Sequence, residues 1–267
     1  MKKIYRYTSM VALAAVLASC STVPLSGRRQ LSLVSDEQIQ EQAAVAYKEF
    51  LNSSSTKVVT GTSNAALVKN VGNRIASAVN QYLAAEGLAQ QYNFNWEFNL
   101  VESSDVNAWC MPGGKVAVYT GILPFTANEA GLATVMGHEI AHAIARHSME
   151  QMSNQYAMQV GAQVLGVATA GKSSIVQGLL NNAYGIGGQL ALLKYSRNNE
   201  SEADQLGLIF MAMAGYNPES AVGFWERMAS AKAANSTPEF LSTHPSDARR
   251  INDIKKLIPT AMKYYKR

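Results

Sequence analysis

The stretch His138-Glu139-Ile140-Ala141-His142 lies in the middle of the most strongly marked helical segment of the chain, which we predict over residues 126–148. Histidines four residues apart lie one turn apart on the same face of a helix, so both imidazoles can bind one metal ion. The intervening glutamate points about 100° away and can reach a water molecule on that ion without binding the ion itself. We therefore predict His138 and His142 as metal ligands and Glu139 as the general base.

Zinc is the cofactor that this pattern favours, at one ion per chain. It accepts imidazole nitrogen, leaves a position open for water and lowers the pKa of that water towards ~7. A third protein ligand is needed, and the metzincin spacing does not supply it, because Ala145 and Ser148 stand where that spacing needs glycine and histidine. His147 is expected on the opposite side of the helix from His138, as a surface or capping residue.

A second predicted helix, over about residues 198–214, carries the acids that can complete the site. Glu200, Asp204 and Gly207 share one face, and its small side chains suit a close approach to the histidine face. We expect Glu200 to be the third zinc ligand and Asp204 to accept a hydrogen bond from the free N–H of a ligand histidine. Glu202 points about 200° away from Glu200 and is held in reserve as an alternative ligand.

Several further segments carry a family resemblance. The stretch Ser196-Arg197-Asn198-Asn199-Glu200-Ser201-Glu202-Ala203-Asp204, downstream of the histidine pair, resembles the CAAX-prenyl-protease/HtpX family of gluzincin zinc metalloendopeptidases. Asn107-Ala108, Pro112-Gly113-Gly114-Lys115-Val116 and Thr243-His244-Pro245-Ser246 are similar to other motifs of that family, in the family's order. The resemblance implies hydrolysis of peptide bonds in unfolded or misassembled cell-envelope proteins, as in the minimal, lipid-anchored members.

The fold that we expect is α+β and mainly α-helical. It is a zincin (gluzincin-like) catalytic domain over residues 35–267, with a small antiparallel or mixed sheet next to the zinc helix. Residues 94–100 alternate apolar and polar side chains, which predicts a strand with one buried face, and residues 115–119 predict a second strand. Residues 151–195 are expected to form a helical hairpin or a lid.

The peptide is expected to add to the 115–119 strand as a further strand, because main-chain hydrogen bonds give sequence-tolerant binding. We therefore assign substrate binding to Gly113, Gly114, Lys115 and Val116. Arg197 either contacts the substrate or pairs with nearby acids, and structural pairing is the preferred interpretation.

His244 has three possible roles. It can stabilise the developing oxyanion, occupy the open zinc position in a resting state, or simply stand at the start of the last helix. The sequence leaves these alternatives open.

The N-terminus has the composition of an export signal. Residues 1–19 contain Lys2, Lys3 and Arg6, no acid, and a short apolar run. The run ends in Leu17-Ala18-Ser19-Cys20, which resembles a bacterial lipobox. We predict a signal peptide over residues 1–19, lipidation at Cys20, and a lipid anchor and tether over residues 20–34. The expected location is the cell envelope, at the outer membrane facing the periplasm.

Composition excludes other classes of function. The chain has 267 residues, of which 48% are hydrophobic and 16% charged. Its net charge of +4 falls to +1 without the N-terminal signal. A nearly neutral domain gives no indication of nucleic-acid binding. Two cysteines cannot build a disulfide framework, and Cys110 is expected to be a small packed residue rather than a catalytic thiol. The alternative functions are an envelope assembly or holdase protein that uses the zincin scaffold only for binding, and a structural zinc site. The oligomeric state is not predicted.

Overall fold

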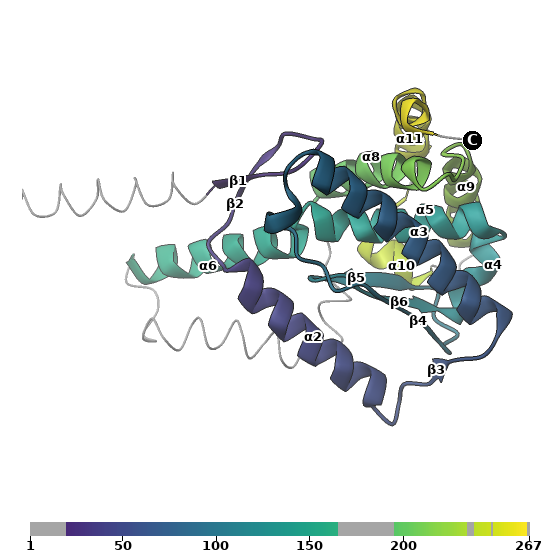
Figure 1. Ribbon diagram of the computed structural model, residues 1–267, viewed down its shortest axis with the longest axis horizontal. Helices are drawn as coiled ribbons and strands as arrows, with labels where there is room; N and C mark the ends of the chain where they lie inside the picture. Colours follow the sequence, from purple (N-terminus) through teal and green to yellow (C-terminus); the bar gives the residue numbers. More distant parts are fainter. Residues whose placement is uncertain (1–19, 165–194, 234–237, 247, 266–267) are drawn as a thin grey trace, which may run out of the picture.

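The computed structural model describes residues 20–164, 195–233, 238–246 and 248–265. A small sheet lies between the helix α2 (Asp36–Asn52) on one side and a group of helices on the other (Figure 1). That group includes α3 (Ser63–Ala85), α5 (Glu129–Ile144) and α8 (Arg197–Met213). The mainly helical α+β class is confirmed. The predicted signal peptide and most of the predicted lid lie outside the described residues.

The sheet is mixed and has four strands in the order β3-β4-β6-β5. These are β3 (Val58–Val59), β4 (Glu97–Val101), β5 (Ala108–Met111) and β6 (Lys115–Tyr119). Strands β4 and β6 run parallel, with Phe98 opposite Val116, whereas β5 is antiparallel to β6. Both faces are covered, because Val116 and Val118 belong to the main core and Ala117 packs with Tyr47 of α2.

Helix α5 is the central element, and nearly all of its side chains are buried. It begins after Asn128, whose side chain accepts a hydrogen bond from the backbone N–H of Gly131 at 2.9 Å. The segment around Thr126 forms a separate short helix, α4 (Leu123–Thr126), so α5 begins three residues after the predicted start at residue 126.

Helix α5 ends at Ile144, earlier than the predicted end at residue 148. Arg146 adopts a left-handed backbone conformation, with φ +56°, and a new helix, α6 (His147–Val164), begins directly after it. The Arg146 guanidinium pairs with Asp36, lies 4.2 Å from the ring centre of Tyr92 and donates to the backbone oxygen of Gln91. These contacts hold a conformation that helical periodicity alone does not anticipate.

The N-terminal residues of the described chain form a hairpin of β1 (Cys20–Thr22) and β2 (Arg29–Leu31). Val23 in its loop is buried in the main core, and the backbone N–H of Leu33 donates to Ser153 of α6 at 2.9 Å. The stretch that we expected to be a tether therefore has a regular structure packed on the domain.

Three more helices follow α8 in the described part of the chain. These are α9 (Ser220–Ala233), α10 (Glu239–Thr243) and α11 (Ala248–Ala261). Short 3-10 turns are η1 (Ala89–Gln91), η2 (Thr120–Ile122) and η4 (Met262–Tyr264). None of the helices within the described ranges is long and apolar enough to cross a membrane.

Helices α5 and α8 pack with their backbones in contact at two glycines. A Cβ atom on Gly207 would lie 2.8 Å from the backbone nitrogen of His138, and one on Gly137 would lie 2.9 Å from the backbone oxygen of Gly207. No side chain can occupy this space, which confirms the predicted close approach of two small-sided faces. The contact sets the distance between the histidine pair and Glu200.

We predict that Gly207→Ala lowers the free energy of unfolding by about 1–3 kcal/mol, because the added methyl group forces the two helices apart. Urea unfolding measures the change. The matched control is Gly223→Ala in α9, where the new methyl would meet only the flexible end of Arg227. We expect the control to change stability by less than about 1 kcal/mol, and equal effects of the two substitutions would contradict the proposed contact.

Candidate metal centre

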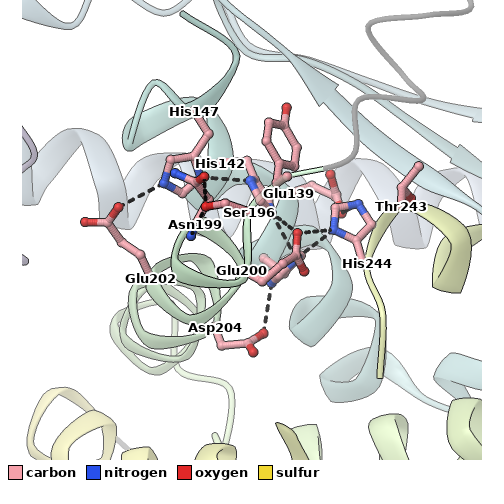
Figure 2. A network of polar contacts seen from close by, with 12 residues as sticks. Glu139, His142, His147, Ser196, Asn199, Glu200, Glu202, Asp204, Thr243 and His244 are labelled. Carbon is pink, nitrogen blue, oxygen red and sulfur yellow. Dashed lines mark hydrogen bonds and ion pairs between the residues drawn. The ribbon is translucent and has the colours of Figure 1, made fainter. Parts of the chain in front are cut away.

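Four buried side chains bring their ligand atoms together at the middle of the domain. They come from three elements: His138 and His142 from α5, Glu200 from α8, and His244 from the residue that follows α10. Their ligand atoms all lie within 4.8 Å of one another. Figure 2 shows His142, Glu200 and His244 pointing toward a common centre. A cluster of this kind can hold a metal ion.

The distances inside the cluster suit tetrahedral zinc. Zinc–nitrogen bonds of about 2.0–2.1 Å place neighbouring ligand atoms about 3.3 Å apart. The Nε2 atoms of His138 and His142 are 3.1 Å apart, and His244 Nδ1 lies 3.2 Å from His138 Nε2 and 2.9 Å from Glu200 Oε1. The Glu200 oxygens lie 3.4 and 3.5 Å from His142 and His138. The residues present therefore fit a zinc ion.

The second nitrogen of His138 is held by a carboxylate. Oδ1 of Asp204 lies 3.0 Å from His138 Nδ1. When Nδ1 carries the proton and donates it to Asp204, the lone pair of Nε2 points into the cluster. Burial by itself would lower the pKa of His138, but its hydrogen bonds with Asp204 and Glu200 raise it.

The remaining ionisable ligands carry the charges that a metal site needs. Burial lowers the pKa of His142 well below its usual value, which keeps this imidazole neutral. Burial would raise the pKa of Glu200, but the charge of His244 and the hydrogen bonds with His138 and His142 hold it well below its usual range. Glu200 is thus an anionic ligand beside the neutral imidazole of His142.

Arg250 is a functional candidate that was not predicted from the sequence. Its side chain is buried, donates to both oxygens of Asp204 at 2.8 Å and lies 2.9 Å from Glu200 Oε2. The guanidinium also lies 3.7 Å from the ring centre of Trp225. It therefore balances the charges of two buried carboxylates, and its position four residues after Ser246 in the family-like motif was the available signal.

Glu139 lies beside the cluster without belonging to it. Its Oε1 lies 3.5 Å from Nε2 of His244, and this oxygen has no hydrogen-bond partner within the described part of the chain. Burial raises the pKa of Glu139 to about 7, against the lowering effects of His244, Arg250 and a hydrogen bond from the backbone of Cys110. A carboxylate with a free oxygen and a pKa near neutrality is suited to exchange protons with water.

His147 and Glu202 differ from their predicted positions. His147 was expected as a surface or capping residue, but it is 1% exposed, and its Nδ1 lies 2.8 Å from Nδ1 of His142. The left-handed break at Arg146 turns its side chain back towards α5. Glu202, the reserve ligand, points away from the cluster and bonds to His147 instead (Figure 2).

The predicted substrate-binding strand is not an edge strand, so that prediction is wrong. Strand β6 is paired on both sides, with β4 and with β5. Val116 is fully buried, and the Lys115 amine donates to the backbone oxygen of Asn95 and pairs with Glu97. Alternation of side chains locates a strand, but it does not reveal the order of strands in a sheet.

The other predicted substrate residues lie at the entrance to β6 or on the surface. Gly113 and Gly114 have left-handed φ values of +80° and +83°, and a Cβ on Gly114 would lie 2.5 Å from the ring of Trp96. The glycines are thus explained by the turn and its packing. Arg197 is exposed at the first residue of α8.

Cys110 is buried in β5, as expected for a packed residue. Burial and the nearby charge of Glu139 raise the pKa of its thiol well above its usual value. A thiol held in its neutral form is a poor nucleophile, which argues against a catalytic cysteine.

Comparisons with known proteins identify related metallopeptidases. A mitochondrial metalloendopeptidase OMA1 of Schizosaccharomyces pombe is 32% identical over 240 residues, which are 90% of this chain and 66% of the relative. OMA1 of Saccharomyces cerevisiae is 38% identical over 64% of this chain and 49% of its own length. The β-barrel assembly-enhancing protease of Escherichia coli K12 is 27% identical over 66% of this chain and 38% of its own length. This chain thus spans between about two fifths and two thirds of these relatives.

The comparisons contradict the predicted location at an outer membrane facing the periplasm. Relatives that match 90% of this chain are named as mitochondrial proteases, in fission yeast, cattle and humans. The N-terminal pattern resembled a lipobox. A short pattern of small residues before a cysteine is a less specific indication of location than a match along most of the chain.

The family model of Peptidase family M48 matches residues 69–258, a span that contains all four members of the cluster, the Glu139 beside it and Arg250. Relatives over most of the length and a metal-binding geometry at the matched residues agree with this result. The chain belongs to Peptidase family M48, a family of zinc-dependent peptidases.

Proposed function

We propose that this protein is a zinc-dependent endopeptidase in which His138, His142 and Glu200 hold the metal and Glu139 is the general base. The observation that supports the proposal most strongly is the position of Glu139, whose Oε1 accepts no hydrogen bond from the described residues, next to a four-membered cluster with the dimensions of a zinc site. Zinc, when bound, supplies Lewis acidity, which lowers the pKa of water and polarises a carbonyl.

Glu139 is suited to move the proton. It accepts a proton from the attacking water and passes it to the nitrogen of the leaving amine. Its burial favours this exchange, because a pKa of about 7 allows both protonation states near neutral pH, although a divalent cation beside it would lower that value. Oε1 has no competing hydrogen bond within the described residues, which leaves it available for water.

The peptide is proposed to bind along β5, which replaces β6 in this role. β5 is at one end of the four-stranded sheet. The backbone of Cys110 in β5 donates a hydrogen bond to Glu139, so a peptide paired with this strand would pass close to the general base. Main-chain pairing recognises an extended segment with little regard to its sequence. That mode of binding favours unfolded or misassembled proteins as substrates.

Within this class of unfolded or misassembled proteins, we propose that the substrates are proteins of the cell envelope. Its support is the resemblance described above and the names of bacterial relatives, since proteins of Vibrio cholerae, Yersinia pestis and Escherichia coli are called β-barrel assembly-enhancing proteases.

His244 is proposed to occupy the fourth position of the metal site in a resting state. Its Nδ1 lies within the ligand cluster, at 2.9 Å from Glu200 Oε1, whereas an oxyanion-stabilising residue would keep its donor beside the reacting carbonyl. It lies in the connection between α10 and α11, so its removal from the cluster does not require either α5 or α8 to move.

We predict that Glu139→Gln reduces cleavage of unfolded casein by at least about 100-fold, the usual contribution of a general acid–base group. The amide has the size of the carboxyl group but cannot accept the proton, so zinc binding should persist at one ion per chain. Elemental analysis of the same samples checks the metal, and His138→Ala should lose it.

Glu226→Gln on the surface of α9, where Glu226 pairs with Lys255, is the matched control and should cleave at the wild-type rate. If the Glu139→Gln protein cleaves casein at the wild-type rate, Glu139 is not the general base. Equal rescue of a deletion strain by the wild-type and Glu139→Gln proteins would favour a holdase function.

We further predict that His244→Ala increases the rate of casein cleavage at saturating zinc by about tenfold, as expected when a ground-state contact of roughly 1.4 kcal/mol is removed. Zinc affinity should fall, because one of four donor groups is lost. A decrease in rate with unchanged zinc affinity would instead identify His244 as a group that stabilises the transition state.

A further inference from the structure

His142 has a second nitrogen that points away from the cluster and meets a histidine instead of a carboxylate. Its Nδ1 lies 2.8 Å from Nδ1 of His147 (Figure 2). A ligand that binds metal through Nε2 must carry its proton on Nδ1, so His142 is the donor of this hydrogen bond. His147 therefore accepts through an unprotonated Nδ1.

This assignment fixes the tautomer of His147 as well. A neutral imidazole with a free lone pair on Nδ1 carries its proton on Nε2. The Nε2 atom lies 2.9 Å from Oε2 of Glu202, which accepts that proton's hydrogen bond. His147 and Glu202 are 1% and 7% exposed, so water does not readily replace either contact. His147 thus connects a buried carboxylate to a metal ligand.

Glu202 is in turn held by the N-terminal hairpin. Arg28 Nε donates to Glu202 Oε2 at 2.6 Å, and the Ser26 hydroxyl donates to Oε1. The same guanidinium donates to Glu150 of α6 at 2.7 Å. A continuous series of hydrogen bonds, Arg28–Glu202–His147–His142, therefore runs from the hairpin to the cluster. We call these four residues the relay.

We propose that His147 is a positioning residue for the metal ligand His142, and that Arg28 maintains this position through Glu202. The inference rests on the proposed metal site. The physical reason is that an imidazole can rotate about its side-chain bonds and exchange its tautomer, and either change would remove the Nε2 lone pair from the cluster. Each member of the relay fixes the proton of the next, so the lone pair keeps its direction without contact between Arg28 and the metal.

The relay is distinct from the arrangement at the other histidine. His138 Nδ1 has a carboxylate directly beside it, Asp204, which Arg250 neutralises. At His142 the carboxylate is one imidazole further away, and the arginine comes from the N-terminal hairpin. Two ligand histidines are therefore oriented by two different arginine–carboxylate pairs. Both carboxylates lie on α8, whereas the two arginines come from opposite ends of the described chain.

The first experiment measures zinc affinity by competition with a chromogenic chelator in His147→Phe and His147→Gln proteins. Phenylalanine keeps the ring and removes both hydrogen bonds, so zinc should bind about 10–100-fold more weakly. Glutamine can accept from His142 with its oxygen and donate to Glu202 with its nitrogen, so it should restore most of the affinity. Circular dichroism confirms that each protein is folded before the titration.

The second experiment tests whether Arg28 acts through His147. Arg28→Met should weaken zinc binding in the wild-type background but have no further effect in the His147→Phe background, because the relay is already interrupted there. Arg74→Met is the matched control. Arg74 also pairs with a glutamate and donates to a backbone oxygen, but it lies outside the relay, and its substitution should leave zinc affinity unchanged.

Wild-type zinc affinity in folded His147→Phe protein would overturn the positioning role, as would equal losses with phenylalanine and glutamine. Equal effects of Arg28→Met in both backgrounds would overturn the part assigned to the hairpin. Retention of zinc by His138→Ala would instead show that the proposed metal site is wrong, so the two failures are distinguishable.

Discussion

The contact between the backbones of α5 and α8 is the constraint on which the site depends. A side chain at Gly137 or Gly207 would separate the two helices, because their main-chain atoms occupy the space of a Cβ. Glu200 lies seven residues before Gly207, which is two helical turns, and therefore on the same face. The short side chain of Asp204 reaches His138, and Glu200 reaches both histidines, only at this helix separation. The geometry of the cluster is thus a consequence of two missing side chains.

Features governed by helical periodicity could be predicted from the sequence. The spacing of His138 and His142 is a property of one helix, and the alignment of Glu200 with Asp204 is a property of another. The absence of large side chains on both faces indicated that the faces meet, and the structure confirms this contact. His244 could be named as a candidate but not placed, because its position depends on how α10 and α11 return to the core.

Features that depend on one residue with a non-helical backbone conformation, or on the order of strands in the sheet, could not be predicted. One left-handed residue, Arg146, ends α5 and turns His147 from the far side of a predicted helix to the nitrogen of a ligand. The contacts that hold Arg146 come from residues far away in sequence, such as Asp36 and Tyr92. Similarly, the sequence of residues 115–119 predicted a strand but gave no information that β5 would pair with β6 and form the end of the sheet.

The charges of the buried residues around the cluster favour a divalent cation at this site. Glu139, Glu200 and Asp204 are buried carboxylates around the cluster, and the guanidinium of Arg250, whose side chain is 9% exposed, pairs with two of them. Glu202 lies apart and is matched by Arg28. Three negative charges and one positive charge give the site a net charge of −2. Neutral imidazoles cannot compensate this charge, whereas a divalent cation compensates it completely. Protons partly substitute for such an ion, since the pKa values of both Glu139 and His138 are raised. Zinc binding is therefore expected to displace protons from the residue proposed to carry out the proton transfer, which links loading of the metal to the formation of the general base.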